Sequence, residues 1–126
     1  MKKLILLYNF SGERLSGVKR SAALLRAAVK EIPKESYGQK LGYLAEVKGY
    51  ERQEPDSQES FDEEMLIMSG FTGDDIEMLI KSLHRHGVGR IALKAIITQT
   101  NIEWTSTQLY RAVREDHEEM MRRRQS

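Results

Sequence analysis

The sequence predicts an α+β fold: a ferredoxin-like two-layer sandwich made from a duplicated βαβ unit, in the order β-α-β-β-α-β, with a C-terminal helix added. The main observation is an internal repeat. Residues 4–21 (LILLYNFSGERLSGVKRS) and residues 65–82 (MLIMSGFTGDDIEMLIKS) each contain an apolar run, Phe, Ser or Thr, Gly, two charged residues and an amphipathic stretch. A second observation is that another apolar run follows each copy. Duplicated split βαβ units are typical of the ferredoxin-like fold.

The alternative fold is a small doubly wound α/β sheet with four parallel strands. The two folds differ in the position of the two Phe-Ser/Thr-Gly turns. A parallel sheet places both turns at one edge, where they would form one site, whereas the ferredoxin-like sandwich places them at opposite ends. The sequence leaves the strand order open.

The first half predicts a strand, a long helix and a weaker strand. The apolar residues within residues 3–9 are continuous rather than alternating, which indicates a strand covered on both faces. Ser11 is a candidate N-cap of the helix, and Pro33 ends it. Gly17 within this helix suggests either close packing or simple tolerance of a glycine, and residues 40–47 form the second, weaker strand. The helix has an apolar stripe with spacings of three and four residues: Leu15, Val18, Ala22, Leu25, Val29 and Ile32.

Residues 48–64 (KGYERQEPDSQESFDEE) predict an acidic, flexible loop between the halves. Pro, Ser, Gln and acidic residues bury too little apolar surface to offset the entropy lost on ordering. This loop holds two basic and seven acidic residues, for a net charge of −5, whereas residues 1–47 hold nine and four, for +5. The basic first half is the basis of one alternative function, nucleic-acid association, although its charges are too spread out for a typical footprint.

The second half repeats the design of the first. Residues 65–68 form the third strand, Thr72 is the candidate N-cap of the next helix, and Gly87 ends that helix. Residues 90–97 (RIALKAII) form the fourth strand. The buried stripe of this helix is Ile76, Leu79, Ile80 and Leu83.

A last helix follows a connection over residues 100–104, with Thr105 or Ser106 as its cap. Its expected inner face consists of Leu109, Ala112, Val113 and Met120. The chain of 126 residues is therefore expected to be a single domain: a first βαβ half over residues 1–47, the loop, and a second half with the C-terminal helix over residues 65–126.

Composition excludes several classes of protein. The chain has no cysteine, which excludes a disulfide framework, a thiolate metal site and a cysteine nucleophile. Its N-terminal apolar run is too short for a signal peptide, and no stretch approaches the roughly 20 apolar residues of a membrane span. We therefore expect a cytoplasmic protein with no membrane partner.

The best candidate pocket lies where the second βαβ unit brings two strand ends together. The two strands of one right-handed βαβ unit are parallel, so their carboxyl ends share an edge. Glycines there let a backbone approach a ligand, and the helix start offers free N–H groups. The candidate residues are Gly70, Phe71, Thr72, Gly73, Thr100, Asn101 and Trp104. A purely structural role is the competing interpretation, and Trp104 is either part of the core or a pocket wall.

No catalytic residue, metal ligand or cofactor site can be assigned from motifs. His84 and His86 are two residues apart and do not face each other on a helix. Asp74 and Asp75 could contact magnesium in a metal-dependent hydrolase, which is a further alternative, but paired acids in a first helical turn are usually caps. The sequence lacks GxSxG, P-loop and GxGxxG motifs.

The C-terminal half resembles a small bacterial domain family of unknown function, over about residues 64–120. The strand ending in Gly70 and Phe71, the later Lys94-Ala95 strand, and the segment from Thr98 to Trp104 carry the resemblance. The family brings no catalytic residues to transfer. It implies only that the Gly-Phe turn and the connection containing Trp104 are family features.

The absence of catalytic motifs favours a non-enzymatic module that senses a small molecule or binds a protein. A homodimer is expected, with the sheet edges and the C-terminal helix as its natural surfaces, because a short four-stranded sheet leaves edges to protect. Nucleic-acid association and a metal-dependent hydrolase are the alternatives. Each ligand class remains open at this level, since both candidate folds host many functions.

Overall fold

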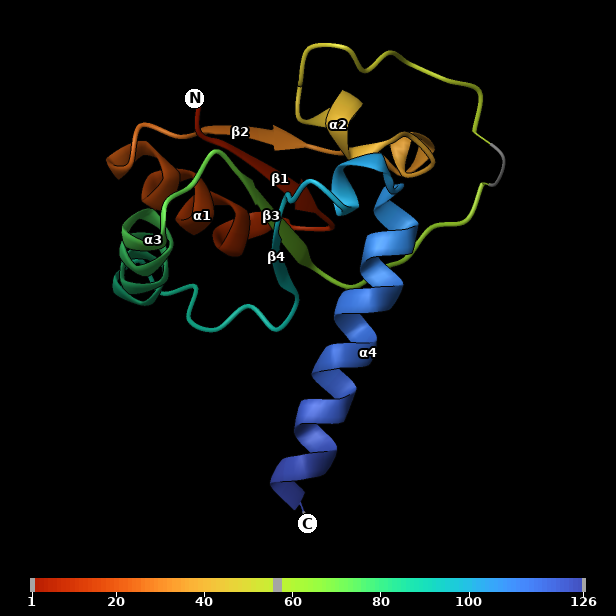
Figure 1. Ribbon diagram of the computed structural model, residues 1–126. Helices are drawn as coiled ribbons and strands as arrows, with labels where there is room; N and C mark the ends of the chain where they lie inside the picture. Colours follow the sequence, from red (N-terminus) through yellow and green to blue (C-terminus); the bar gives the residue numbers. More distant parts are fainter. Residues whose placement is uncertain (1, 56–57, 126) are drawn as a thin grey trace.

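A computed structural model describes residues 2–55 and 58–125 and contains a four-stranded mixed sheet covered on both faces (Figure 1). The sheet order is β2-β1-β3-β4. β1 is parallel to β2, β3 is parallel to β4, and β1 is antiparallel to β3. The strands are β1 (Leu4–Tyr8), β2 (Ala28–Glu31), β3 (Met65–Ser69) and β4 (Lys94–Ile96).

The internal repeat corresponds to two βα units of the same geometry. Helices α1 (Gly12–Leu24) and α3 (Gly73–Arg85) follow β1 and β3. β3 and α3 begin and end 61 residues after β1 and α1. Asn9 and Gly70 occupy the same place in the two turns, and both have a positive φ, 65° and 77°. Asparagine and glycine are the residues that adopt this left-handed conformation most readily.

The ferredoxin-like arrangement is not confirmed, and the parallel alternative is wrong. A ferredoxin-like sheet interlocks the strands of its two units, whereas here the two strands of each unit are direct neighbours. The antiparallel pairing of β1 with β3 excludes a doubly wound parallel sheet. The physical reason for this order is burial. β1 and β3 are continuous apolar runs and lie at the centre, whereas β2 and β4 carry Lys or Glu and lie at the edges.

The first helix is shorter than predicted. α1 ends at Leu24 instead of at Pro33, and the chain turns at Arg26, whose φ is 57°. Ala28–Glu31 then forms β2, which pairs with Leu4–Leu7. Val29 and Ile32 continue the helical spacing by coincidence, and the pairing with β1 overrides that local pattern.

The predicted strand over residues 40–47 is also wrong. After the 3₁₀ helix η1 (Lys34–Ser36), the chain forms the short helix α2 (Leu41–Leu44). Leu41 and Leu44 are buried on the sheet. A single turn of helix buries both of them there, because residues three apart share a helical face. The fourth strand is shorter than predicted and covers only Lys94–Ile96.

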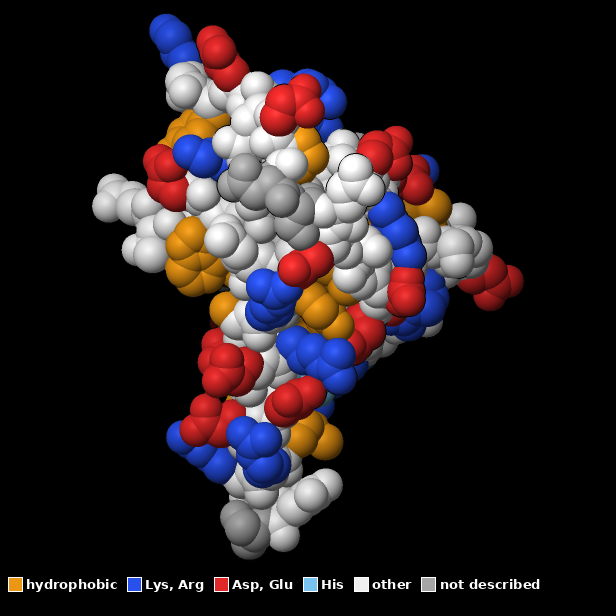
Figure 2. All heavy atoms as spheres, turned by 90° about the vertical axis from the view of Figure 1, so that its right-hand side faces the viewer, with side chains coloured by type: hydrophobic (Ala, Val, Ile, Leu, Met, Phe, Trp, Pro, Cys, Tyr) orange, Lys and Arg blue, Asp and Glu red, His pale blue; other side chains and the backbone are white. Residues whose placement is uncertain are grey.

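Helices cover the two faces of the sheet differently (Figure 1). α1 and α3 pack on one face, over Ile5, Leu7, Leu66 and Met68. The other face is covered by α2 and by the first turns of α4 (Ser106–Gln125), which follows the 3₁₀ helix η2 (Asn101–Glu103). The remainder of α4 projects away from the body, and Figure 2 shows both acidic and basic side chains along it.

Gly17 lies where α1 meets the end of α3. A Cβ atom at this position would lie 2.4 Å from the Val88 Cγ2 atom and 3.2 Å from the carbonyl oxygen of His86. The close packing that the sequence suggested for Gly17 is therefore present. His86 Nδ1 lies 3.1 Å from Ser21 Oγ and joins the same two helices.

The acidic loop is anchored to the body at its C-terminal end. Phe61 is buried and stacks on Tyr37 and Tyr110, with ring centroids 4.6 and 4.0 Å away. The Asn9 amide donates hydrogen bonds to the carbonyl oxygens of Phe61 and Glu63, at 2.9 and 3.0 Å. The described parts of the loop, residues 48–55 and 58–64, contain no helix or strand.

Across residues 2–55 and 58–125, every helix is too short or too polar to cross a bilayer.

Candidate functional site

The residues of the predicted edge pocket lie at one end of the sheet. Gly70 to Gly73 follow β3, residues 98–104 follow β4, and these two strands are parallel. Phe71 and Trp104, however, pack on different faces of the sheet. Phe71 packs against the cluster under α1 and α3, whereas Trp104 packs against the cluster under α2 and α4. The two aromatic side chains therefore do not form the walls of one pocket.

The start of α3 is occupied by its own capping groups. The Asp75 N–H donates to Thr72 Oγ1 at 3.1 Å, and the Thr72 N–H donates to Asp75 Oδ2 at 2.9 Å, which is a complete capping box. Lys3 Nζ lies 3.0 Å from Asp75 Oδ1. The Thr72 backbone N–H, and then Lys3, lower the pKa of Asp75. Asp75 therefore takes the place that an anionic ligand would take at this helix end.

Asn101 closes the connection after β4. Its Oδ1 accepts the Thr98 N–H at 2.8 Å, and its Nδ2 donates to the carbonyl oxygen of Ile96 at 2.9 Å. The Asn101 N–H donates to Thr98 Oγ1 at 3.1 Å, and the residue is only 7% exposed. Thr100 is exposed beside it. The polar groups of Asn101 are thus used within the turn, which supports a structural role.

Trp104 belongs both to the core and to a surface groove. Its carbonyl oxygen accepts the Leu41 N–H at 2.8 Å, which ties α2 to the segment before α4. Its side chain also lines a groove of about 450 Å³ between β4 and α4. The groove is lined by Arg90, Ala92, Lys94 and Ala95 on the strand side, by Trp104, and by Leu109, Ala112, Val113, Asp116, His117 and Met120 on the helix.

The strand side of this groove is basic, and its floor is apolar. Lys94 is half-buried, and burial, followed by the charge of Arg90, lowers its pKa. The Lys94 ammonium group donates to the carbonyl oxygen of Ile91 at 2.5 Å. Asp116 is the acidic group on the opposite wall. The groove therefore combines apolar side chains with basic groups on the strand side and one acidic group on the helix side.

Residues 64–120 match the family model described as a domain of unknown function, DUF3783. The resemblance expected from the sequence is confirmed over the same range. No curated protein and no solved structure matches the chain. The DUF3783 segment contains β3, α3, β4, η2 and most of α4, so every residue that lines the groove lies within it.

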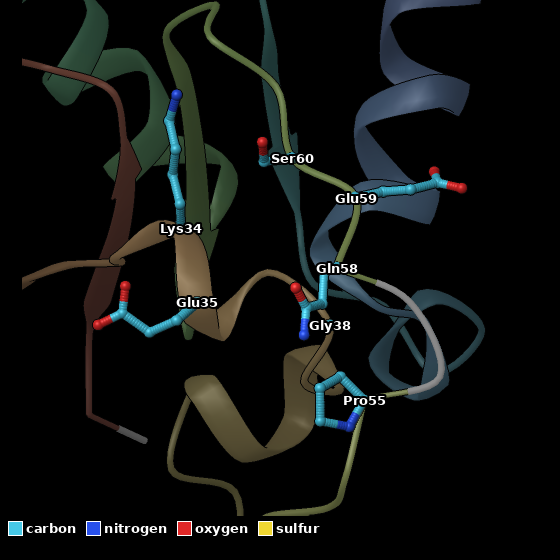
Figure 3. A pocket seen from close by; sticks show the side chains of 7 residues that line it. All are labelled: Lys34, Glu35, Gly38, Pro55, Gln58, Glu59 and Ser60. Atoms are coloured by element: carbon cyan, nitrogen blue, oxygen red, sulfur yellow. The ribbon is translucent and has the colours of Figure 1, made fainter.

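A second hollow lies outside the DUF3783 segment, between η1 and the acidic loop (Figure 3). Its volume is about 330 Å³. Figure 3 shows Lys34, Glu35 and Glu59 pointing in different directions. Lys34 forms an ion pair with Asp62, and Glu59 forms one with Arg111. Lys34 and Glu59 thus have partners already, and the charged side chains around this hollow do not converge on one point.

Within residues 2–55 and 58–125 there is no group of three or more His, Asp or Glu side chains arranged to hold a metal ion. Asp74 is exposed at the start of α3, while Asp75 belongs to the capping box.

Sequence reasoning missed the groove between β4 and α4. It placed Leu109, Ala112, Val113 and Met120 on the inner face of the last helix and expected that face to be covered. Leu109 is only 3% exposed, whereas Met120 is 48% exposed. The signal that could have found the groove is length: α4 has 20 residues, about 30 Å, and the neighbouring β4 has three, about 10 Å.

Proposed function

We propose that this protein is a non-enzymatic protein-interaction module that binds its partner in the groove between β4 and α4. The observation that carries the proposal is a partly apolar groove beside an edge strand, with the exposed apolar side chain of Met120 in its lining. Met120 on α4 is 48% exposed, and Trp104 and Val113, which also line the groove, are only partly buried. Exposed apolar surface beside an unpaired strand is typical of interaction sites.

The position of β4 supports this choice. β4 pairs with β3 on one side only and is the last strand of the sheet. Its outer side has no strand partner in the described chain. The Asn101 side-chain amide donates a hydrogen bond to the Ile96 carbonyl oxygen, so the edge of the sheet is partly protected at the C-terminal end of β4. A partner that lies along α4 would cover the remainder and the groove together.

The predicted edge pocket gives less support to small-molecule sensing. The capping box uses Thr72 and Asp75, and the turn after β4 uses the amide of Asn101. Ligand pockets typically contain a few polar groups that converge on one volume. Here the polar groups are directed at their own backbone.

In the folded protein, much of the basic charge of the first half is paired with carboxylate groups. Five of its cationic side chains form ion pairs: Lys3 with Asp75, Arg14 with Glu64, Lys19 with Glu31, Lys34 with Asp62, and Lys40 with Glu103. A nucleic-acid surface requires cations that are free to meet phosphates. The pairing therefore favours protein binding over nucleic-acid association.

Photo-cross-linking tests the proposal directly. A photoreactive amino acid at His117, in the full chain expressed in its host cells, is expected to give a discrete cross-linked protein species. Ala92→Trp, which fills the groove from an exposed position, should abolish that species. Ala23→Trp, at an exposed position on α1, is the matched control and should leave it unchanged. Equal cross-linking in the two variants, or no cross-link at all, would contradict the proposal.

A further inference from the structure

We propose that the partner is a second copy of this chain, which pairs with the projecting half of α4 at the end of the groove in an antiparallel, two-fold symmetric arrangement. This inference rests on the proposed function and names its partner. Its basis is the order of apolar and charged residues along one face of α4.

The face of α4 that packs on the sheet continues beyond it. Leu109, Val113, Met120 and their neighbours recur at helical spacing, so they lie on one side of the helix. Leu109 is buried against the sheet, whereas Met120 is half-exposed, about three turns further along. The same apolar stripe therefore begins in the core and runs out over solvent, where only another molecule can cover it.

The charges of the projecting half are ordered in two blocks. Glu115, Asp116, Glu118 and Glu119 form an acidic block, and Arg122, Arg123 and Arg124 form a basic block, with Met120 and Met121 between them. Figure 2 shows acidic and basic side chains along this part of the helix. Arg114 pairs with Glu118, and Arg123 pairs with Glu119, within the helix. Asp116 and Arg124 have no ion-pair partner among the described residues.

This order is self-complementary only for antiparallel helices. Asp116 and Arg124 lie four residues before and after Met120, and residues four apart share a helical face. If the two-fold axis passes at Met120, Asp116 of each copy faces Arg124 of the other, and the two Met120 side chains meet at the axis. A parallel pair would instead oppose Asp116 to Asp116 and Arg124 to Arg124. A two-fold interface of this kind forms a closed dimer.

The size of the contact indicates a weak dimer. The projecting residues 114–125 span about 18 Å, roughly three turns. A helix pair of this length buries less than the roughly 1,200 Å² of standard stable interfaces. The tip of each helix reaches Asp116 at the end of the groove, where the contact is the ion pair of Asp116 with Arg124. We therefore expect a dissociation constant on the order of micromolar or weaker.

Charge exchange between two variants is the decisive test. Asp116→Arg and Arg124→Asp each place like charges across the interface, so each variant alone should self-associate about tenfold more weakly than the wild type. An equimolar mixture restores both opposite-charge contacts and should form a heterodimer of wild-type affinity, measured by sedimentation equilibrium. Circular dichroism confirms that each variant is folded. A mixture no tighter than the separate variants would overturn the proposal.

Disulfide trapping gives an independent readout, because the chain has no cysteine of its own. Met120→Cys places one thiol from each copy at the axis and should form a covalent dimer on mild oxidation. Arg122→Cys is the matched control, because residue 122 is two positions after Met120 and therefore lies on the opposite side of the helix. Equal cross-linking of both variants would contradict the antiparallel register.

The failures of the two proposals are distinguishable. If the wild type stays monomeric at about 1 mM while the groove cross-link from His117 captures a different protein, the self-association is wrong and the groove proposal stands. If the His117 cross-link is also absent, both are wrong.

Discussion

At the residue scale, Tyr8 shows how a side chain that sequence analysis places in a strand acquires its partners from distant segments. Tyr8 is fully buried, its hydroxyl lies 2.7 Å from Ser106 Oγ, and its ring packs edge-on against Tyr37. Burial, the largest influence, raises its pKa strongly, although the hydrogen bond with Ser106 acts in the opposite direction. Burial also raises the pKa of Tyr37 and of Tyr110.

These shifts predict a loss of stability at alkaline pH. Above the unfolded-state value of about 10, the unfolded chain releases tyrosine protons that the folded chain retains. The folded state then binds more protons than the unfolded state, so the free energy of unfolding falls as pH rises. Urea unfolding between about pH 8 and about pH 11 should show this decline, with a shallower slope in Tyr8→Phe. Parallel profiles for the two proteins would contradict the assignment to Tyr8.

Gly17 is a residue for which the sequence left two roles open, and the structure shows the close packing. A glycine inside a helix costs helix stability, so its presence suggested a close approach. The structure supplies the neighbours, Val88 and the His86 carbonyl group, which lie 71 and 69 positions further along the chain (88 − 17 and 86 − 17). Their identity could not be predicted, because it depends on how α1 packs against the end of α3.

At the element scale, the two repeated helices begin in different ways. Thr72 accepts a hydrogen bond from the Asp75 N–H and completes a capping box. Ser11, at the equivalent position before α1, makes no side-chain cap hydrogen bond. The sequence proposed both residues as N-caps, but only Thr72 has an acidic side chain three residues later that completes the box, since the equivalent residue in the first unit is Arg14.

The unequal caps predict unequal mutational costs. Thr72→Ala should lower the free energy of unfolding by about 1 kcal/mol, because an N–H of α3 loses its partner. Ser11→Ala should cost distinctly less, since no side-chain bond is lost there. Chemical denaturation of the two variants beside the wild type measures the difference. Equal costs would mean that the capping box contributes no stability.

The misassigned elements share one physical cause. Residues 28–32 carry apolar side chains at a spacing that fits a helix, and residues 40–47 contain a run that fits a strand. The first segment became β2 because β1 offered it a hydrogen-bonding edge. The second became α2 because its leucines fill the face of the sheet near Tyr37 and Phe61. Both outcomes depend on neighbours that are distant in sequence.

At the scale of the whole molecule, charge that is separated along the chain is brought together in space. The +5 of residues 1–47 and the −5 of residues 48–64 meet through Arg14 with Glu64 and through Lys34 with Asp62. The Arg14 guanidinium group also donates to the Val88 carbonyl oxygen at 2.8 Å. The Arg14 side chain therefore joins the first half to the loop, through Glu64, and to the second half, through Val88. These contacts support a single folding unit.

The matched DUF3783 segment should not fold by itself in this protein. β3 pairs with β1 along all of its five residues, and Met65, Leu66 and Ile67 are fully buried. A fragment of residues 64–126 loses β1 and α1, so it exposes an apolar edge and most of one helix-packing face. Circular dichroism should show no cooperative thermal transition for the fragment, in contrast to the full chain. A cooperative transition in the fragment would show that the first half is dispensable for folding.

The sequence by itself determined the two βα units, the capped start of α3, the single long last helix and the resemblance of residues 64–120 to a domain of unknown function. These features depend on short-range signals, such as continuous apolar runs, the Asn after β1 and the Gly after β3, and side-chain caps. The tertiary structure alone decided the antiparallel pairing of β1 with β3, the edge positions of β2 and β4, and the groove beside α4. It also decided that residues 28–31 form a strand instead of a helix and that residues 41–44 form a helix instead of a strand. Those features depend on which surfaces meet, and local spacing allows more than one answer to that question.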